Sequence, residues 1–156
     1  MHKLYPLAMF LLAGSLFAAD PFAGTWKLNL AKSKFEGPMK PPKELTIVIQ
    51  EQGDQGFDIV TSVAADGSHI SNKYAFPKTG GEVKVVEGQS APGTSSVLAK
   101  RKADARTRDW TITLPSRVTL HEHDVVSKDG KTMQMSTKGM DGQGKSYETI
   151  EVFDRM

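Results

Sequence analysis

The sequence contains no cysteine among its 156 residues. This absence excludes disulfide bridges, thiolate metal sites, cysteine nucleophiles and a lipid-modified N-terminal cysteine. The chain also has little excess charge, with 20 Lys and Arg against 18 Asp and Glu. This near balance argues against a nucleic-acid-binding protein. The chain also lacks a Gly-x-Ser-x-Gly sequence, a glycine-rich phosphate loop and a His-Glu-x-x-His sequence. We therefore expect neither enzymatic activity nor a cofactor.

The long hydrophobic run of the chain lies at its N-terminus. Residues 4–19 carry no charge, follow Lys3, and end in the small residues Ala18 and Ala19. This pattern is typical of a secretory signal, and it predicts a signal peptide over residues 1–18 and one mature domain over residues 19–156. A membrane-spanning helix needs about 20 apolar residues, and we expect no such segment in the chain after cleavage. Export of a chain without cysteine favours a bacterial periplasmic or secreted protein.

The rest of the sequence alternates between apolar and polar residues. Trp26, Leu28 and Leu30 fall on one side of the first such run, and similar runs recur to the end of the chain. A period of two is typical of strands that bury one face, and Asp-Gly pairs such as Asp66-Gly67 and Asp129-Gly130 predict tight hairpins between them. No long segment has the helical period. The pattern predicts an all-β fold, an antiparallel up-and-down barrel of about 8–10 strands.

Two segments interrupt this alternation. Residues 31–43 include Pro38, Pro41 and Pro42 and predict a loop. Because loops on rigid scaffolds carry function, one alternative is a non-catalytic interaction or inhibitor module whose protein partner is unknown. Five basic residues fall between positions 100 and 108, and we interpret them as a solvated hairpin end.

The start of the first alternating run carries a family resemblance. Gly24, Thr25 and Trp26 form a Gly-x-Trp sequence that resembles the lipocalin signature of the calycin superfamily. Residues 24–35 and 126–132 also resemble small exported bacterial lipocalin-like proteins of unassigned function. The resemblance implies a barrel like those of lipocalins and fatty-acid-binding proteins, in which Trp26 plugs the closed end. It also implies that Arg155, on the last strand, packs against Trp26 as a cation–π pair.

A barrel of this size can enclose one small ligand. We therefore predict that the protein binds a small hydrophobic or amphipathic molecule inside the barrel, with Asn72 and Tyr74 orienting it through hydrogen bonds. The same side chains could instead fill a solid core, and a slip of one residue would exchange the inner and outer faces. The candidate lining residues are Ile47, Ile49, Ile59, Ile70, Asn72, Tyr74, Phe76, Trp110, Ile112, Met133 and Met135.

Histidines provide a second alternative, a periplasmic zinc-binding barrel. His121 and His123 point the same way on a strand, and His69 could add a third nitrogen. Two histidines at this spacing are common on solvated strands, where Glu122 and Asp124 would also fit. We therefore treat the histidines as weak metal candidates and expect no resident metal.

Overall fold

The computed structural model describes residues 20–36, 40–88, 106–113, 118–140 and 144–156, and the backbone of residues 96–103. The predicted signal peptide, residues 1–18, lies outside these ranges and stays a prediction. In the part of the chain described, no helix is long and apolar enough to cross a membrane.

The described residues form eleven strands and one short 3-10 helix, η1. Their bounds, in chain order, are β1 (Gly24–Leu28), η1 (Leu30–Lys32), β2 (Lys34–Phe35), β3 (Glu44–Gln52), β4 (Gln55–Val63), β5 (His69–Pro77), β6 (Gly81–Gly88), β7 (Ser96–Ala103), β8 (Thr107–Thr113), β9 (Thr119–Val126), β10 (Thr132–Met140) and β11 (Ser146–Arg155).

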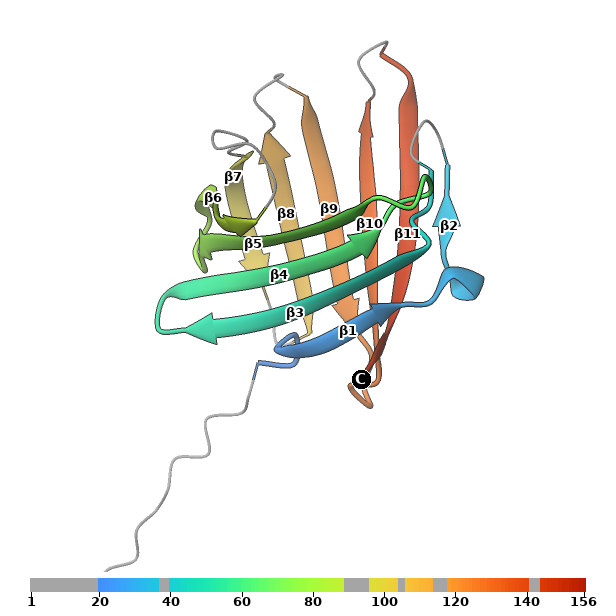
Figure 1. The fold of residues 1–156 in the computed structure, drawn as a ribbon. Coiled ribbons are helices and arrows are strands. Elements are labelled where there is room, and N and C mark those ends of the chain that lie inside the picture. The colour runs from blue at the N-terminus through green and yellow to red at the C-terminus, as the bar shows by residue number, and fades with distance from the viewer. Residues whose placement is uncertain (1–19, 37–39, 89–95, 104–105, 114–117, 141–143) are drawn as a thin grey trace, which may run out of the picture.

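The strands follow one another around a barrel. From β3 to β11 each strand pairs antiparallel with the next, and β1 pairs with both β3 and β11. These pairings close a ring of ten strands, to which the two-residue β2 adds beside β11. In Figure 1, strands β1, β3, β4 and β5 cross in front of β7–β11 at a steep angle. The prediction of an all-β antiparallel barrel is confirmed.

Turn chemistry sets the hairpins of this barrel. Between β4 and β5, Gly67 has a φ of 90°, a conformation that side chains disfavour, and the backbone N–H of Ser68 donates to Asp66 Oδ1 at 2.9 Å. Between β9 and β10, Gly130 has a φ of 70° and the N–H of Lys131 donates to Asp129 Oδ1 at 3.1 Å. Both Asp-Gly pairs thus form turns where the sequence predicted them.

One end of the barrel is closed around Trp26, which is fully buried. Its Nε1 donates to the carbonyl of Phe22 at 2.7 Å, and the Arg155 guanidinium lies 4.1 Å from the centre of the indole ring system. Arg155 also donates to the carbonyls of Gly130, Ala23 and Pro21. The structure thus brings together the tryptophan and the arginine that the calycin resemblance pairs. Below, "the plug" means residues 20–26 together with Arg155.

Gly24 is required by this same contact. A Cβ atom at Gly24 would lie 2.5 Å from Arg155 Nη1, and the φ of Gly24 is 138°. Any larger residue there would push the guanidinium off the indole. This gives a physical reason for glycine two residues before the tryptophan.

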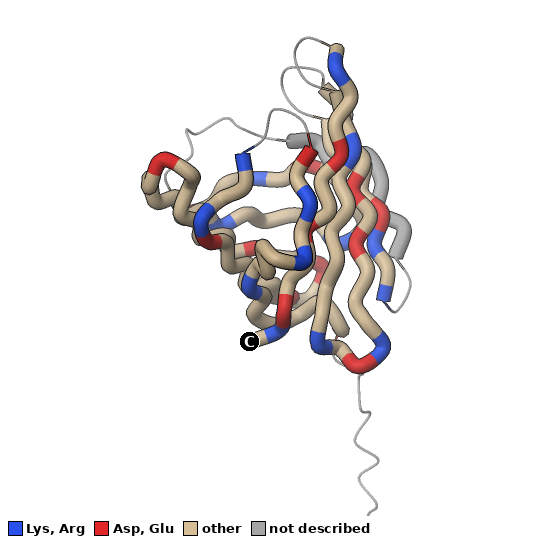
Figure 2. The backbone as a smooth tube through the Cα atoms, turned by 90° about the vertical axis from the view of Figure 1, so that its right-hand side faces the viewer, with Lys and Arg blue, Asp and Glu red and all other residues tan. Residues whose placement is uncertain are grey.

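The buried core extends from the plug into the barrel. Around Trp26 it includes Leu28, Ile47, Met133 and Phe153. A second, smaller cluster pairs Phe76 with Trp110, whose rings meet edge to face with centroids 5.4 Å apart. Charged residues of both signs are interspersed along the strands, as Figure 2 shows. The space between the two clusters holds the cavity described next.

Candidate functional site

A cavity of about 140 Å³ lies inside the barrel, lined by thirteen side chains from seven strands. Nine are apolar or aromatic and four are charged, which is the composition typical of a small-molecule site. The lining residues are Ile47 and Ile49 on β3, Asp58 on β4, Tyr74 and Phe76 on β5, Val83 on β6, Arg108, Trp110 and Ile112 on β8, Glu122 and Asp124 on β9, and Met133 and Met135 on β10.

Eight of the eleven candidate residues named from the sequence line this cavity. They are Ile47, Ile49, Tyr74, Phe76, Trp110, Ile112, Met133 and Met135. The structure therefore brings together residues that lie up to 88 positions apart, from Ile47 to Met135.

The other three candidates lie elsewhere. Ile59 is on the outer face, because its neighbour Asp58 points into the cavity and successive side chains of a strand alternate. Ile70, near the start of β5, is 40% exposed. Asn72 is buried and reaches the cavity through Tyr74, to whose hydroxyl its Nδ2 donates at 3.2 Å.

Four charged residues of the cavity, Asp58, Arg108, Glu122 and Asp124, were missed from the sequence. Arg108 lies in the basic run that we interpreted as a solvated hairpin end, yet it is only 3% exposed. That interpretation is wrong for Arg108, which alternates in phase with the inward Trp110 on β8. The interpretation of Glu122 and Asp124 as residues of a solvated strand is likewise wrong, because both line the cavity, in phase with buried Val126 on β9. The phase relative to an inward apolar residue is thus the signal that would have found Arg108, Glu122 and Asp124, but not Asp58.

Arg108 connects the cavity to the plug. Its Nη2 lies 2.9 Å from Asp20 Oδ2 and 3.3 Å from Glu51 Oε1, and its guanidinium lies 3.8 Å from the ring centre of Phe22. Lys78 Nζ pairs with the other oxygen of Glu51 at 2.5 Å. Two cations and two carboxylates therefore balance one another at this end of the cavity.

The carboxyl of Asp124 is deeply buried, with the residue 4% exposed. Its Oδ2 accepts a hydrogen bond from Trp110 Nε1 at 3.1 Å, while its Oδ1 has no hydrogen-bond partner among the described residues. Burial raises the pKa of Asp124 well above its ordinary value, and the neighbouring charge of Glu122 raises it further. A buried acceptor of this kind is costly when it stays unmatched.

Glu122 lies beside Asp124 on the same inner face of β9. Desolvation raises the pKa of Glu122 from 4.5 to about 7, with further contributions from the charges of Asp58 and Glu151. Thr137 Oγ1 on β10 donates to Glu122 Oε2 at 3.3 Å. The interior of the barrel therefore carries carboxyl groups whose pKa values are raised toward neutral pH.

The weak metal candidates do not converge. His123 lies on the outer face with its Nδ1 2.6 Å from Asp109 Oδ1, and His121 Nδ1 lies 3.5 Å from Thr111 Oγ1. His69 is exposed at the start of β5. Within the described ranges, no group of three or more His, Asp or Glu side chains is placed to hold a metal ion.

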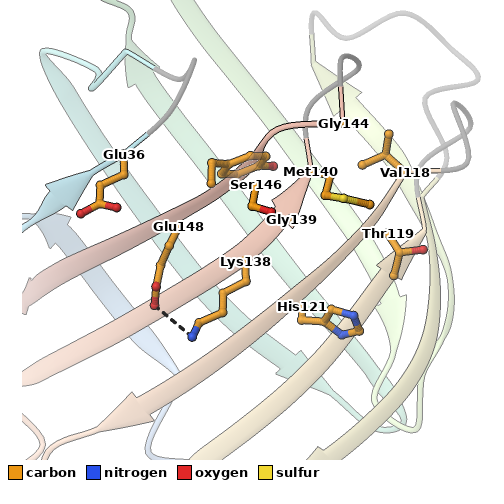
Figure 3. A pocket seen from close by; sticks show the side chains of 11 residues that line it. Glu36, Val118, Thr119, His121, Lys138, Gly139, Met140, Gly144, Ser146 and Glu148 are labelled. Carbon is orange, nitrogen blue, oxygen red and sulfur yellow. Dashed lines mark ion pairs between the residues drawn. The ribbon is translucent and has the colours of Figure 1, made fainter.

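A larger hollow of about 750 Å³ lies on the surface at the far ends of β9, β10 and β11. Figure 3 shows Lys138 and Glu148 paired across it, with His121 and Met140 at its edge. The Lys138 Nζ to Glu148 Oε1 distance is 3.4 Å, and their side chains are 66% and 41% exposed. This ion pair is a surface contact, so the barrel interior is the better candidate site.

No known protein family matches the sequence, and no curated protein is similar to it.

Three solved structures are similar to this chain. The zebrafish ileal bile acid-binding protein complexed with cholic acid is 14% identical, over 87% of this chain and 99% of that one, with a TM-score of 0.50. EF1p2_mFAP2b bound to DFHBI is 10% identical, over 89% and 97% of the two chains, with a TM-score of 0.45. A de novo designed fluorescence-activating β-barrel is 12% identical, with the same coverage and a TM-score of 0.42. The first of these similarities shows the fold alone, an antiparallel β-barrel like that of the bile acid-binding protein.

Proposed function

We propose that this chain is an exported, non-catalytic lipocalin-like protein that binds a small apolar or amphipathic molecule inside its barrel. The observation that carries the proposal is the interior cavity of about 140 Å³ with its mainly apolar and aromatic lining. Transfer of an apolar ligand from water into such a lining is favourable, and methionines such as Met133 and Met135 adapt to its shape.

The cavity volume sets the size of the ligand. An apolar cavity of roughly 150 Å³ in another protein binds one benzene molecule. The interior described here can therefore hold a ligand of about one aromatic ring without any change in the barrel wall. The Tyr74 hydroxyl and the buried carboxyls provide the few polar groups that would fix its orientation.

Export is proposed from the N-terminal sequence. Residues 1–18 have the positive start, apolar run and small terminal residues of a secretory signal. Expression of the full chain in a bacterium, followed by cell fractionation and N-terminal sequencing, tests this. A periplasmic product beginning at Ala19 supports export, and an uncleaved cytoplasmic product contradicts it.

Binding in the interior is tested by calorimetric titration of residues 19–156 with toluene, a single-ring apolar probe. We expect toluene to bind the unmodified protein. The variant Val83→Phe, which fills the cavity from β6, should bind toluene at least about tenfold more weakly, because the added ring takes the ligand's place.

The matched control is Ile59→Phe, which adds the same kind of side chain on the outer face of β4. It should leave toluene binding unchanged. No binding of toluene by the unmodified protein, or equal losses in Val83→Phe and Ile59→Phe, would refute an interior site.

A further inference from the structure

The charges that face the cavity are unequal in sign. Asp58, Glu122 and Asp124 are three acids in its lining, and Arg108 is the one base in it. A purely apolar ligand makes no use of these acids, yet their burial is unfavourable for the empty protein. Three inward acids in a mainly apolar barrel therefore require an explanation beyond packing.

Arg108 is engaged with other acids. Its Nη2 contacts the carboxylates of Asp20 and Glu51, and its guanidinium stacks on Phe22. The plug and Glu51 thus take up the positive charge of Arg108. The carboxyl groups deeper in the cavity remain free of Arg108 and would become the negative charge beside a bound cation once they ionise.

Asp124 gives an independent indication of a missing partner. The residue is 4% exposed, it lines the cavity, and its Oδ1 has no hydrogen-bond partner in the described part of the chain. Trp110 Nε1 holds the other oxygen, so the carboxyl is fixed in orientation. A donor from a bound molecule would satisfy the Oδ1 acceptor.

We propose that the ligand is a small organic cation, a protonated amine on an apolar body of about one aromatic ring, whose ammonium group is held by Asp124 and Glu122. This inference rests on the proposed function and names the chemical class of its ligand. The ring of such a ligand fits among Phe76, Trp110 and the aliphatic lining. Its ammonium group has three hydrogen-bond donors, and its positive charge would balance the negative charge of the ionised carboxyl groups.

A carboxylate ligand is the opposite possibility. Arg108 Nε also has no hydrogen-bond partner among the residues described, so it could donate to an anion. That anion would lie in a cavity already lined by three acids, and it would compete with Asp20 and Glu51 for the same guanidinium. Charge repulsion of this kind favours the cation.

Proton release should accompany binding of the amine. Glu122 has a pKa of about 7, so about half of its carboxyl groups are protonated at pH 7 before a ligand binds. An adjacent ammonium group lowers this pKa, and the proton leaves as the amine enters. The charged and titratable groups whose side chains are described around Glu122 are Asp58 on β4, Tyr74 on β5, Arg108 on β8, Asp124 on β9 and Glu151 on β11.

The sign of the pH dependence follows. At pH 8 Glu122 is mostly ionised and ready for the cation, whereas at pH 6 the amine must displace a proton. A group with a pKa of about 7 makes the affinity fall about tenfold between these two pH values. Toluene, which carries no charge, should not show this loss.

The experiment compares four probes of nearly equal size on the unmodified protein by calorimetry: benzylamine, benzyl alcohol, toluene and benzoate. We expect benzylamine to bind at least about tenfold more tightly than toluene and benzyl alcohol at pH 8. At pH 6, where most Glu122 carboxyl groups carry a proton, its binding should release protons, measured by titration in buffers of different ionisation enthalpy. Benzylamine binding no tighter than toluene, or benzoate binding tighter than benzylamine, overturns the cation while leaving interior binding intact. No binding by any of the four refutes the proposed function itself.

Two variants locate the ammonium. Asp124→Asn and Glu122→Gln should each weaken benzylamine at least about tenfold and leave toluene unchanged, because each keeps the size of the side chain and removes a carboxyl group that would ionise beside the ammonium. The control Glu44→Gln makes the same change at an exposed position of β3. Full benzylamine affinity in both cavity variants would overturn the placement of the ammonium group at Asp124 and Glu122. If either variant fails to fold, the comparison of the four probes on the unmodified protein decides the ligand class.

Discussion

Replacement of Glu122 by Gln should stabilise the protein, and only above acidic pH. The pKa of Glu122 rises from 4.5 to about 7 in the barrel, chiefly because the carboxyl is desolvated. In the folded protein the proton is therefore held more tightly than in the unfolded chain. The stability that this contributes is complete below pH 4.5 and is lost as the pH rises through about 7.

The magnitude follows from the two pKa values. Their difference of about 2.5 corresponds to about 3 kcal/mol of unfolding free energy lost by the unmodified protein across this window. Glutamine keeps the size of the side chain and an oxygen that can accept from Thr137. The variant should equal the unmodified protein near pH 4.5 and exceed it by up to about 3 kcal/mol at pH 8.

Urea denaturation of both proteins at pH 5 and pH 8, followed by circular dichroism, measures this difference. The acids whose pKa values are lowered, Asp66, Asp129 and Asp154, titrate below this window. Burial raises the pKa values of Asp124 and Glu151, which are present in both proteins, so the test is the difference between the two proteins and not either pH curve alone. Glu44→Gln, on the surface, should show no such pH dependence. An equal difference between Glu122→Gln and the unmodified protein at both pH values would refute the reasoning, because it would mean that ionisation of Glu122 is not what changes.

Three further substitutions test the plug and the wall, each by urea denaturation at pH 7. Trp26→Ala should lower the unfolding free energy by about 3–5 kcal/mol, because it empties a fully buried site; a loss under about 1 kcal/mol would contradict this. Arg155→Lys keeps the charge but cannot donate to three carbonyls at once, and should lower the unfolding free energy by about 1–3 kcal/mol. An unchanged midpoint of urea denaturation would show that these three hydrogen bonds of the guanidinium are dispensable. Gly56→Ala drives a Cβ into the ring of Phe76 and should lose about 1–3 kcal/mol, whereas an unaffected protein would show that Phe76 moves freely.

The architecture was accessible from the sequence because it depends on repeated local signals. Each described strand supplies its own alternation, and the pairs Asp66-Gly67 and Asp129-Gly130 supply a positive φ at their turns. The Gly-x-Trp sequence then indicated where the plug would form. A wrong boundary in one short strand does not change the predicted fold when all the other strands indicate the same fold.

The faces of individual strands were harder to assign. On β4, Phe57 and Ile59 are apolar but lie outside, where Lys73 Nζ sits 5.3 Å from the Phe57 ring centre, and polar Asp58 lies inside. A rule that places apolar residues inward chooses the wrong face there. The rule fails where the interior holds charge, which is expected of a site whose chemistry takes precedence over stability.

The plug makes the two ends of the folded domain depend on each other. Trp26 is covered by a guanidinium that comes 129 residues later in the chain, and the backbone of β1 pairs with that of β11. During synthesis, β1 therefore has neither its second neighbour nor its stacking partner until residue 155 has left the ribosome. Contacts of such long range slow folding, so the nascent chain exposes an apolar edge for most of its translation. Late closure of this kind would keep the chain open during any step that needs it unfolded, including the export proposed above.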